Sequence, residues 1–183
     1  MFAAIKERQG TYIEFKGAEN CDLVSKSLEN ATQGITLLNF RNEISDDGAV
    51  VQAATVFVPV GKENYFNKKI QEYLEQETSA GNAKNKPLVE SIETIKLAVV
   101  SSFWIGDVKH IPMEKSEWCE YWLRTEALEE IKVATQFYNL CDKMEISHKD
   151  TYIVFPEKVV VLAKTNNAKI HELLNECNAI AEI

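Results

Sequence analysis

The sequence predicts an α+β fold of two βαββα units, each a split β-α-β or ferredoxin-like arrangement with an antiparallel sheet, joined by a helix. Three observations indicate this fold. Strand-like segments alternate with amphipathic helical segments, the order β, α, β, β, α occurs twice, and turn-forming residues separate the segments. The predicted boundaries are 9–78 for the first unit, 79–116 for a linker, connecting helix and loop, and 117–183 for the second unit.

The first unit is predicted from changes of hydrophobic period along the chain. Residues 11–16 alternate between two faces, as in a half-buried strand, and residues 20–34 then carry apolar side chains at helical spacing. Residues 34–42 and 50–60 are rich in β-branched and aromatic side chains, with polar turn residues between them, which indicates a hairpin. An amphipathic helix is expected from Gly61 to about Glu77.

The middle of the chain has the composition of a connection. Residues 78–87, TSAGNAKNKP, are small and polar and end in proline, as in a linker. Apolar residues then recur at steps of three and four from Leu88 to Phe103, which predicts one connecting helix with a single apolar stripe. Gly106 and Pro112 are expected to end this helix and lead the chain to the next strand.

The second unit repeats the order of the first. Its predicted elements are a strand at 118–124, a helix at 126–141, a hairpin of 145–155 and 158–164 that turns at Pro156 and Glu157, and a helix that begins at Asn166 or Asn167. Residues 179–183 are expected to begin the fourth strand of this unit. A longer protein could then continue past Ile183.

Composition and charge narrow the classes of function. The chain has 183 residues, a formal net charge of −8 and a sequence pI of about 5.0. Negative charge repels phosphate backbones, so we expect no nucleic-acid partner. No window approaches the roughly 18 apolar residues of a membrane span, and the N-terminal residues become charged too early for a secretory signal. We therefore expect a cytoplasmic protein with no membrane partner.

The sequence predicts no catalytic, cofactor-binding or metal-binding residue, and no cofactor. The four cysteines and three histidines lack the close spacing of metal ligands, so the cysteines are expected to be structural thiols. The chain contains no Gly-x-Ser-x-Gly nucleophile turn and no glycine-rich phosphate-binding loop. Its acidic clusters fit a hairpin turn and the first turn of a helix.

All three tryptophans lie within residues 101–125. If residues 118–124 form a strand, two of the tryptophans share one side with a carboxylate and a guanidinium, and the other side carries Cys119, Tyr121 and Leu123. One hypothesis is a central strand whose tryptophans pack on the sheet face opposite the helices. The other is a docking surface, because tryptophan and arginine are enriched in interface hot spots. The candidate protein interface consists of Trp104, Trp118, Glu120, Trp122 and Arg124.

The same segment resembles a known family. SSFWIGD, then a proline, then WCEYWLR is similar to a pattern in the N-terminal region of a bacterial group of subtilisin-like serine proteases. Further segments that match in the same order are GITLLNFR, ATVFVPVGK, YFNKKIQEY, LVESIETIKLA and FPEKVVVL. The chain departs from the family pattern at Cys119 and Tyr121, which leaves the strand period intact.

The resemblance implies a subtilase-propeptide-like region that precedes a catalytic domain. The three sequence settings of the subtilase catalytic triad do not occur in the chain, so it is not expected to be an enzyme. The implied partner is a subtilase catalytic domain, in cis or in trans, which this module would help to fold, inhibit or regulate. One alternative is a recognition or assembly module that binds a further protein and relays to the protease. A less favoured alternative is a nucleic-acid-binding ferredoxin-like domain.

Overall fold

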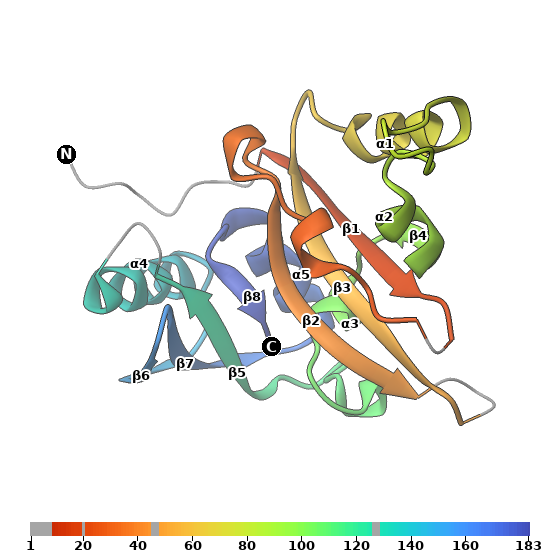
Figure 1. The fold of residues 1–183 in the computed structure, drawn as a ribbon. Helices are drawn as coiled ribbons and strands as arrows, with labels where there is room; N and C mark the ends of the chain where they lie inside the picture. Colours follow the sequence, from red (N-terminus) through yellow and green to blue (C-terminus); the bar gives the residue numbers. More distant parts are fainter. Residues whose placement is uncertain (1–8, 20, 45–47, 126–128) are drawn as a thin grey trace. The chain divides into compact units, whose positions relative to one another are not determined.

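The computed structural model describes residues 9–19, 21–44, 48–125 and 129–183, and the chain divides into two compact units (Figure 1). One unit is formed by residues 9–98 and the other includes residues 99–183. The segment 79–116, expected to connect the units, is thus shared between them. None of the helices in the described ranges is long and apolar enough to cross a bilayer.

The first unit is a four-stranded antiparallel sheet with strand order β2-β3-β1-β4. Its elements are β1 (Gly10–Gly17), the 3-10 turns η1 (Ser25–Ser27) and η2 (Ala31–Gln33), β2 (Thr36–Ile44), β3 (Val50–Pro59), α1 (Tyr65–Glu75), α2 (Lys86–Ser91) and β4 (Ile92–Leu97). The predicted first strand, hairpin strands and amphipathic helix are confirmed. The turn predicted between the hairpin strands falls largely on residues 45–47, outside the described residues.

The second unit has the equivalent strand order, β6-β7-β5-β8. Its elements are α3 (Val100–Phe103), η3 (Val108–His110), β5 (Glu117–Arg124), α4 (Glu130–Lys143), β6 (His148–Phe155), β7 (Lys158–Thr165), α5 (Asn167–Glu176) and β8 (Ile180–Glu182). The expected fourth strand near the end of the chain is confirmed as β8, which pairs with β5. The predicted start of the α4 helix at Glu126 lies outside the described residues. The α+β, ferredoxin-like fold class is therefore confirmed, and each sheet has four strands.

The helix predicted from Leu88 to Phe103 is wrong. The segment instead forms α2, the strand β4 and the short helix α3. Residues 92–97 include Ile92, Thr94 and Ile95, whose β-branched side chains favour a strand. In β4 these residues pair with β1, so they supply hydrogen-bond partners to a strand that would otherwise form the sheet edge. The apolar steps of three and four therefore belong to different elements.

The helix predicted at residues 20–34 is also wrong. The described part of this segment contains only η1 and η2. The Asn30 side chain accepts a hydrogen bond from the Gln33 N–H, and Gly34 adopts a left-handed backbone with φ of 71°. Both features favour a local turn over a continuous helix. Leu23 and Leu28 still reach the core, which explains why they mimic an amphipathic pattern.

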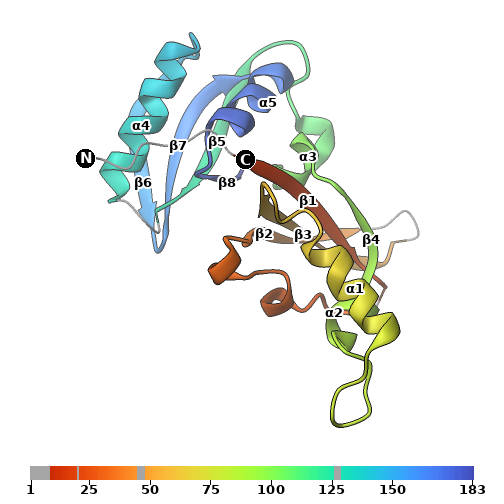
Figure 2. The same cartoon turned by 90° about the horizontal axis from the view of Figure 1, so that it is seen from above.

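Each sheet buries one face beneath its own helices. In the first unit, Phe15 of β1 packs edge to face on Phe66 of α1, with ring centroids 4.7 Å apart. In the second unit, Tyr121 of β5 contacts Phe137 of α4, with centroids 5.1 Å apart, and its hydroxyl lies 2.8 Å from Thr165 Oγ1. Figure 2 shows α4 and α5 running alongside the strands of this sheet. The alternation in β5 leaves its other side chains on the opposite face, called here the outer face.

The thiols provide a test of this packing. Burial raises the pKa of Cys141 to about 12 and raises that of Cys119 above its usual value, whereas Cys21 is exposed. Because the thiolate is the reactive form, we expect one fast-reacting thiol in the folded chain at pH 8 and four after denaturation in urea. Titration with a chromogenic disulfide reagent measures both numbers. Cys21→Ser should remove the fast phase, and a second fast thiol in that variant would contradict the packing.

Candidate protein interface on the second sheet

The outer face of β5 carries four of the five residues predicted as an interface. Cys119, Tyr121 and Leu123 are buried beneath the helices, and the alternating residues lie on the opposite side of the sheet. The four residues on that side are Trp118, Glu120, Trp122 and Arg124. Trp118 is 45% exposed, and Trp122 and Arg124 are half-buried. The tryptophans of β5 therefore lie outside the core that the helices cover.

Trp122 is held in place by a neighbouring strand. Its ring stacks on Phe155 of β6, with centroids 5.0 Å apart and an interplanar angle of 29°. The two residues share the outer face because Trp122 lies opposite Val160, Val160 lies opposite Ile153, and Phe155 follows two residues after Ile153. Ile153 is 62% exposed and Phe155 is 41% exposed. Their side chains continue the apolar surface from the centre of the sheet to its β6 edge.

Two lysines flank the aromatic rings. Lys149 Nζ lies 4.9 Å from the centroid of the Trp118 ring, and Lys158 Nζ lies 5.8 Å from that of Trp122. Lys158 also donates to Glu182 Oε1 of β8 at 2.6 Å, so its charge is neutralised locally. The set of Trp118, Trp122, Ile153 and Phe155 with Lys149 and Lys158 is called the aromatic face below.

Trp104 is not part of this strand. It follows α3 as a half-buried C-cap residue, in a segment that pairs with the end of the chain. On either side of it, the Ile183 N–H donates to Phe103 O at 2.8 Å, and the Ile105 N–H donates to Ile183 O at 2.7 Å. The backbone around Trp104 is therefore fixed near the C-terminus, and this residue belongs to a different element from the aromatic face.

Four of the six residues of the aromatic face were not predicted from the sequence. Lys149, Ile153, Phe155 and Lys158 come from the hairpin of β6 and β7, some 30 residues after β5 in the chain. The apolar run from Tyr152 to Phe155 was a usable signal. A strand with one buried face needs an apolar residue only at every second position, whereas here four large uncharged residues follow one another. Its position on an edge strand depends on the strand order, which the pattern alone does not give.

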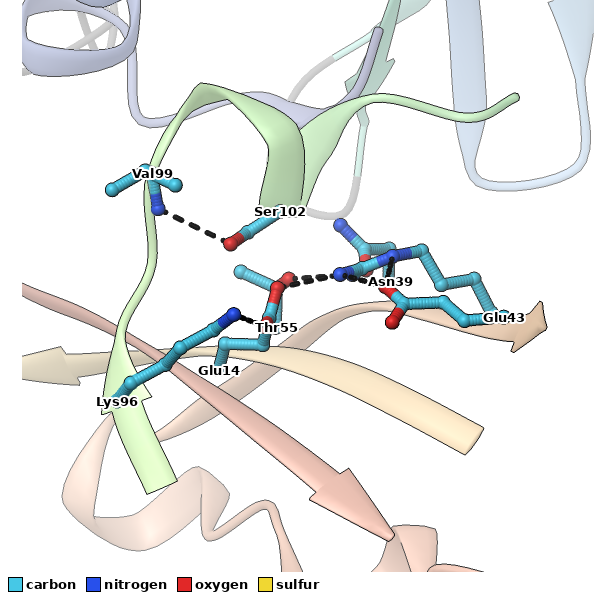
Figure 3. Close-up of polar contacts among 8 residues, drawn as sticks. Glu14, Asn39, Glu43, Thr55, Lys96, Val99 and Ser102 are labelled. Atoms are coloured by element: carbon cyan, nitrogen blue, oxygen red, sulfur yellow. Dashed lines mark hydrogen bonds and ion pairs between the residues drawn. The ribbon is translucent and has the colours of Figure 1, made fainter. Parts of the chain in front are cut away.

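The sheet of the first unit carries a cluster of charged and polar side chains (Figure 3). Arg41 of β2 reaches over β3 to Glu14 of β1, with Nη2 2.5 Å from Oε2, and Lys96 of β4 lies 2.8 Å from Glu14 Oε1. Side chains of Ala53 and Thr55 are small enough to let the guanidinium cross β3. Figure 3 shows Glu14, Thr55 and Lys96 on one side of the sheet, and separately the bond from the Val99 N–H to Ser102 Oγ, 3.1 Å, that caps α3 in the second unit.

The charged groups of this cluster are ion-paired and hydrogen-bonded to one another. Arg41 also contacts Glu43 at 2.8 Å and donates to Asn39 Oδ1 and Thr55 Oγ1, both at 3.2 Å. Two cations face two carboxylates, and Glu14 is only 3% exposed. Every nitrogen of the guanidinium thus has an acceptor, as in a structural ion-pair network. The geometry favours a role in holding β1, β2, β3 and β4 in register over a role in binding a ligand.

Two polar side chains of the second unit, His148 and Tyr138, lie between α4 and β6. In the described ranges, no three His, Cys, Asp or Glu side chains are grouped to hold a metal ion. His148 Nε2 is hydrogen-bonded to Asp142 Oδ1 at 3.0 Å, and its ring stacks on Tyr138 with centroids 4.8 Å apart. The buried His148 Nδ1 makes no hydrogen bond to any described residue, although Asp150 Oδ1 lies 3.2 Å away. The Tyr138 hydroxyl donates to Thr151 O at 2.9 Å, and burial raises the pKa of this hydroxyl to about 12, so it stays protonated well above neutral pH. These groups tie α4 to β6.

Comparison with known proteins gives distant likenesses to solved structures. Neither a protein-family model nor a curated protein matches this sequence. A solved structure described as that of a candidate glycine cleavage system transcriptional repressor aligns over 90% of this chain and 88% of its own, with a TM-score of 0.30 and 5% identity.

These findings correct the family prediction and the expectations that depended on it. The resemblance to a subtilase N-terminal region was wrong, since no family model and no curated protein, of that group or any other, matches this sequence. A propeptide-like function, relay to a protease and a subtilase partner are withdrawn with it. The exclusion of nucleic acid is withdrawn as well.

Proposed function

We propose that this chain is a non-enzymatic binding protein whose second unit docks a protein partner on the aromatic face. The observation that carries the proposal is the exposure of Trp118, 45%, beside a Trp122–Phe155 stack that the helices do not cover. Large aromatic side chains that are rigidly held and partly exposed are the residues that contribute most to protein interfaces. The expectation that the chain has no catalytic activity of its own forms part of the proposal.

The charges beside the rings indicate the chemistry of the partner. Lys149 is exposed and lies over Trp118, so a carboxylate of the partner can approach the cation while an apolar side chain covers the ring. Lys158 is already paired with Glu182, so its ammonium group would not be buried as a lone charge. The fitting partner is a protein segment with an apolar anchor flanked by acidic residues. None of the four cysteines is in a disulfide, as expected of a protein in a reducing cytoplasm, and this location remains a prediction.

Trp118→Ala should weaken partner binding without unfolding the chain. Loss of an interface hot spot costs about 2 kcal/mol, which corresponds to roughly a 30-fold weaker affinity. Trp118 is half outside the fold, so the free energy of unfolding should change by less than about 1 kcal/mol. A photoreactive amino acid at position 118 would capture the partner in cells, and calorimetry with the purified partner would then measure the affinity of wild type and variant.

The matched control is Ile131→Ala on α4, which is 56% exposed and lies on the helical side of the same unit. This control should bind the partner as wild type does. Equal loss of affinity in both variants would contradict the aromatic face as the docking site. Capture of single-stranded nucleic acid at position 118, with affinity that falls steeply as salt is raised, would replace the protein partner with a nucleic acid.

A further inference from the structure

The edge strand β6 presents an unusual run of apolar side chains. Tyr152, Ile153, Val154 and Phe155 are 39%, 62%, 53% and 41% exposed, on both faces of the strand. Within the described residues β6 pairs only with β7. The backbone groups on its other side therefore face outward next to apolar side chains. Such an edge readily pairs with another strand, because pairing satisfies the backbone and buries apolar surface together.

The other sheet edges carry the features that prevent such pairing. β2 contains Arg41 and Glu43, β4 contains Glu93 and Lys96, and β8 is only three residues long. Charged side chains and short length are the usual ways in which edge strands avoid association. In β6 the charged residues Lys149 and Asp150 fall before the apolar run, and Pro156 falls after it. The four residues of the apolar run have no such protection.

We propose that two copies of this chain associate through β6, which pairs antiparallel with β6 of the second copy about a two-fold axis at Ile153. In this register Ile153 lies opposite Ile153, Tyr152 opposite Val154, and Phe155 opposite Thr151. Aromatic residues opposite β-branched residues are among the favourable cross-strand pairs. Shifting the axis to Tyr152 would instead place Val154 opposite Asp150 and Phe155 opposite Lys149. The register centred on Ile153 pairs Tyr152, Ile153 and Val154 among themselves, places Phe155 opposite Thr151 and keeps the run clear of those charges.

Charge supports the same register. With the axis at Ile153, the start of β6 that carries Lys149 in one copy lies beside the turn that carries Glu157 in the other, and the two-fold axis brings these opposite charges together twice. The two-fold axis also keeps the helices of both copies on one side, so the two outer faces become one continuous surface. The inference goes beyond the proposed function, because it concerns the strand edge and a second copy, whereas the proposed partner docks on the outer face.

Sedimentation velocity on the full chain, from about 1 μM to about 1 mM, tests the proposal. Wild type should show a concentration-dependent equilibrium between monomer and dimer. Ile153→Lys places two like charges at the symmetry axis and should raise the dissociation constant at least about tenfold. Ile153 is 62% exposed, so circular dichroism and the urea midpoint should stay as in wild type. The matched control is Ile131→Lys on α4, which should leave the equilibrium unchanged.

A charge exchange tests the register itself. Lys149→Glu should weaken the dimer, because the introduced carboxylate would face that of Glu157, and adding Glu157→Lys should restore it. Failure of the double variant to recover would overturn this register. A wild-type monomer at every concentration, or a dimer that Ile153→Lys leaves intact, would overturn the association through β6. A chain that stays monomeric yet binds its partner in a Trp118-dependent way would overturn the dimer and leave the proposed function standing.

Discussion

Replacing Arg41 with methionine is expected to lower the free energy of unfolding by about 3–5 kcal/mol. The guanidinium is the common partner of Glu14, Glu43, Asn39 and Thr55, so its loss leaves several polar groups without that partner at once. The largest part of the cost comes from Glu14, which is 3% exposed and cannot regain water while the sheet is folded. Equilibrium unfolding in urea measures the loss, with an unchanged slope showing that the folded state stays compact.

Two further variants separate the charge from the geometry. Glu14→Gln should cost less than Arg41→Met, because the amide keeps the shape of the carboxylate and Lys96, whose side chain is 55% exposed, can hydrate. The double variant with both changes should recover part of the loss of Arg41→Met, since no buried carboxylate is then left short of a cation. If Arg41→Met cost less than about 1 kcal/mol, the cluster would not be what holds these strands in register.

The sequence was sufficient for elements whose pattern is decided locally. The alternation in 118–124 set which side of β5 each tryptophan occupies, and β5 has that alternation in the structure. The hydrophobic period predicted the wrong secondary structure where pairing with a distant strand determined the conformation. Residues 92–97 have helical spacing but pair with β1, about 80 residues earlier in the chain. No short window contains that information, because the competing force is the unpaired edge of another strand.

The candidate interface likewise contains residues that the sequence could identify and residues that it could not. Trp118 and Trp122 could be named from the sequence, because a tryptophan opposite the core side of a strand must be either covered or exposed. Phe155 and Lys149 could not, because their positions depend on the register of β6 and β7, which shifts between His148 and Tyr152. The Glu14–Arg41 pair likewise joins residues 27 positions apart across an intervening strand. Such contacts are set by strand order, which composition and period leave open.

Replacing Phe137 with alanine is the second change expected to have a large effect, a loss of about 3–5 kcal/mol. Phe137 is fully buried on α4, and its ring packs on Tyr121 in the centre of the second sheet. The cavity left behind cannot fill, because β-strands on one side and α4 on the other limit relaxation. Ile131→Ala on the same helix is the control, and its 56% exposure predicts a change within about 0.5 kcal/mol beyond the small difference in helix propensity.

The comparison of Phe137→Ala with Trp122→Ala decides whether the aromatic face is a core or an interface. Trp122 is half-buried, with Phe155 stacked on its ring and Lys158 nearby, so its truncation should cost clearly less than that of Phe137, although its ring is larger. Urea unfolding of both variants under one condition gives the order. A loss for Trp122→Ala equal to that for Phe137→Ala would mean that the outer face is packed as tightly as the helical side. A smaller loss leaves apolar area on Trp122 and Phe155 that only a partner can bury.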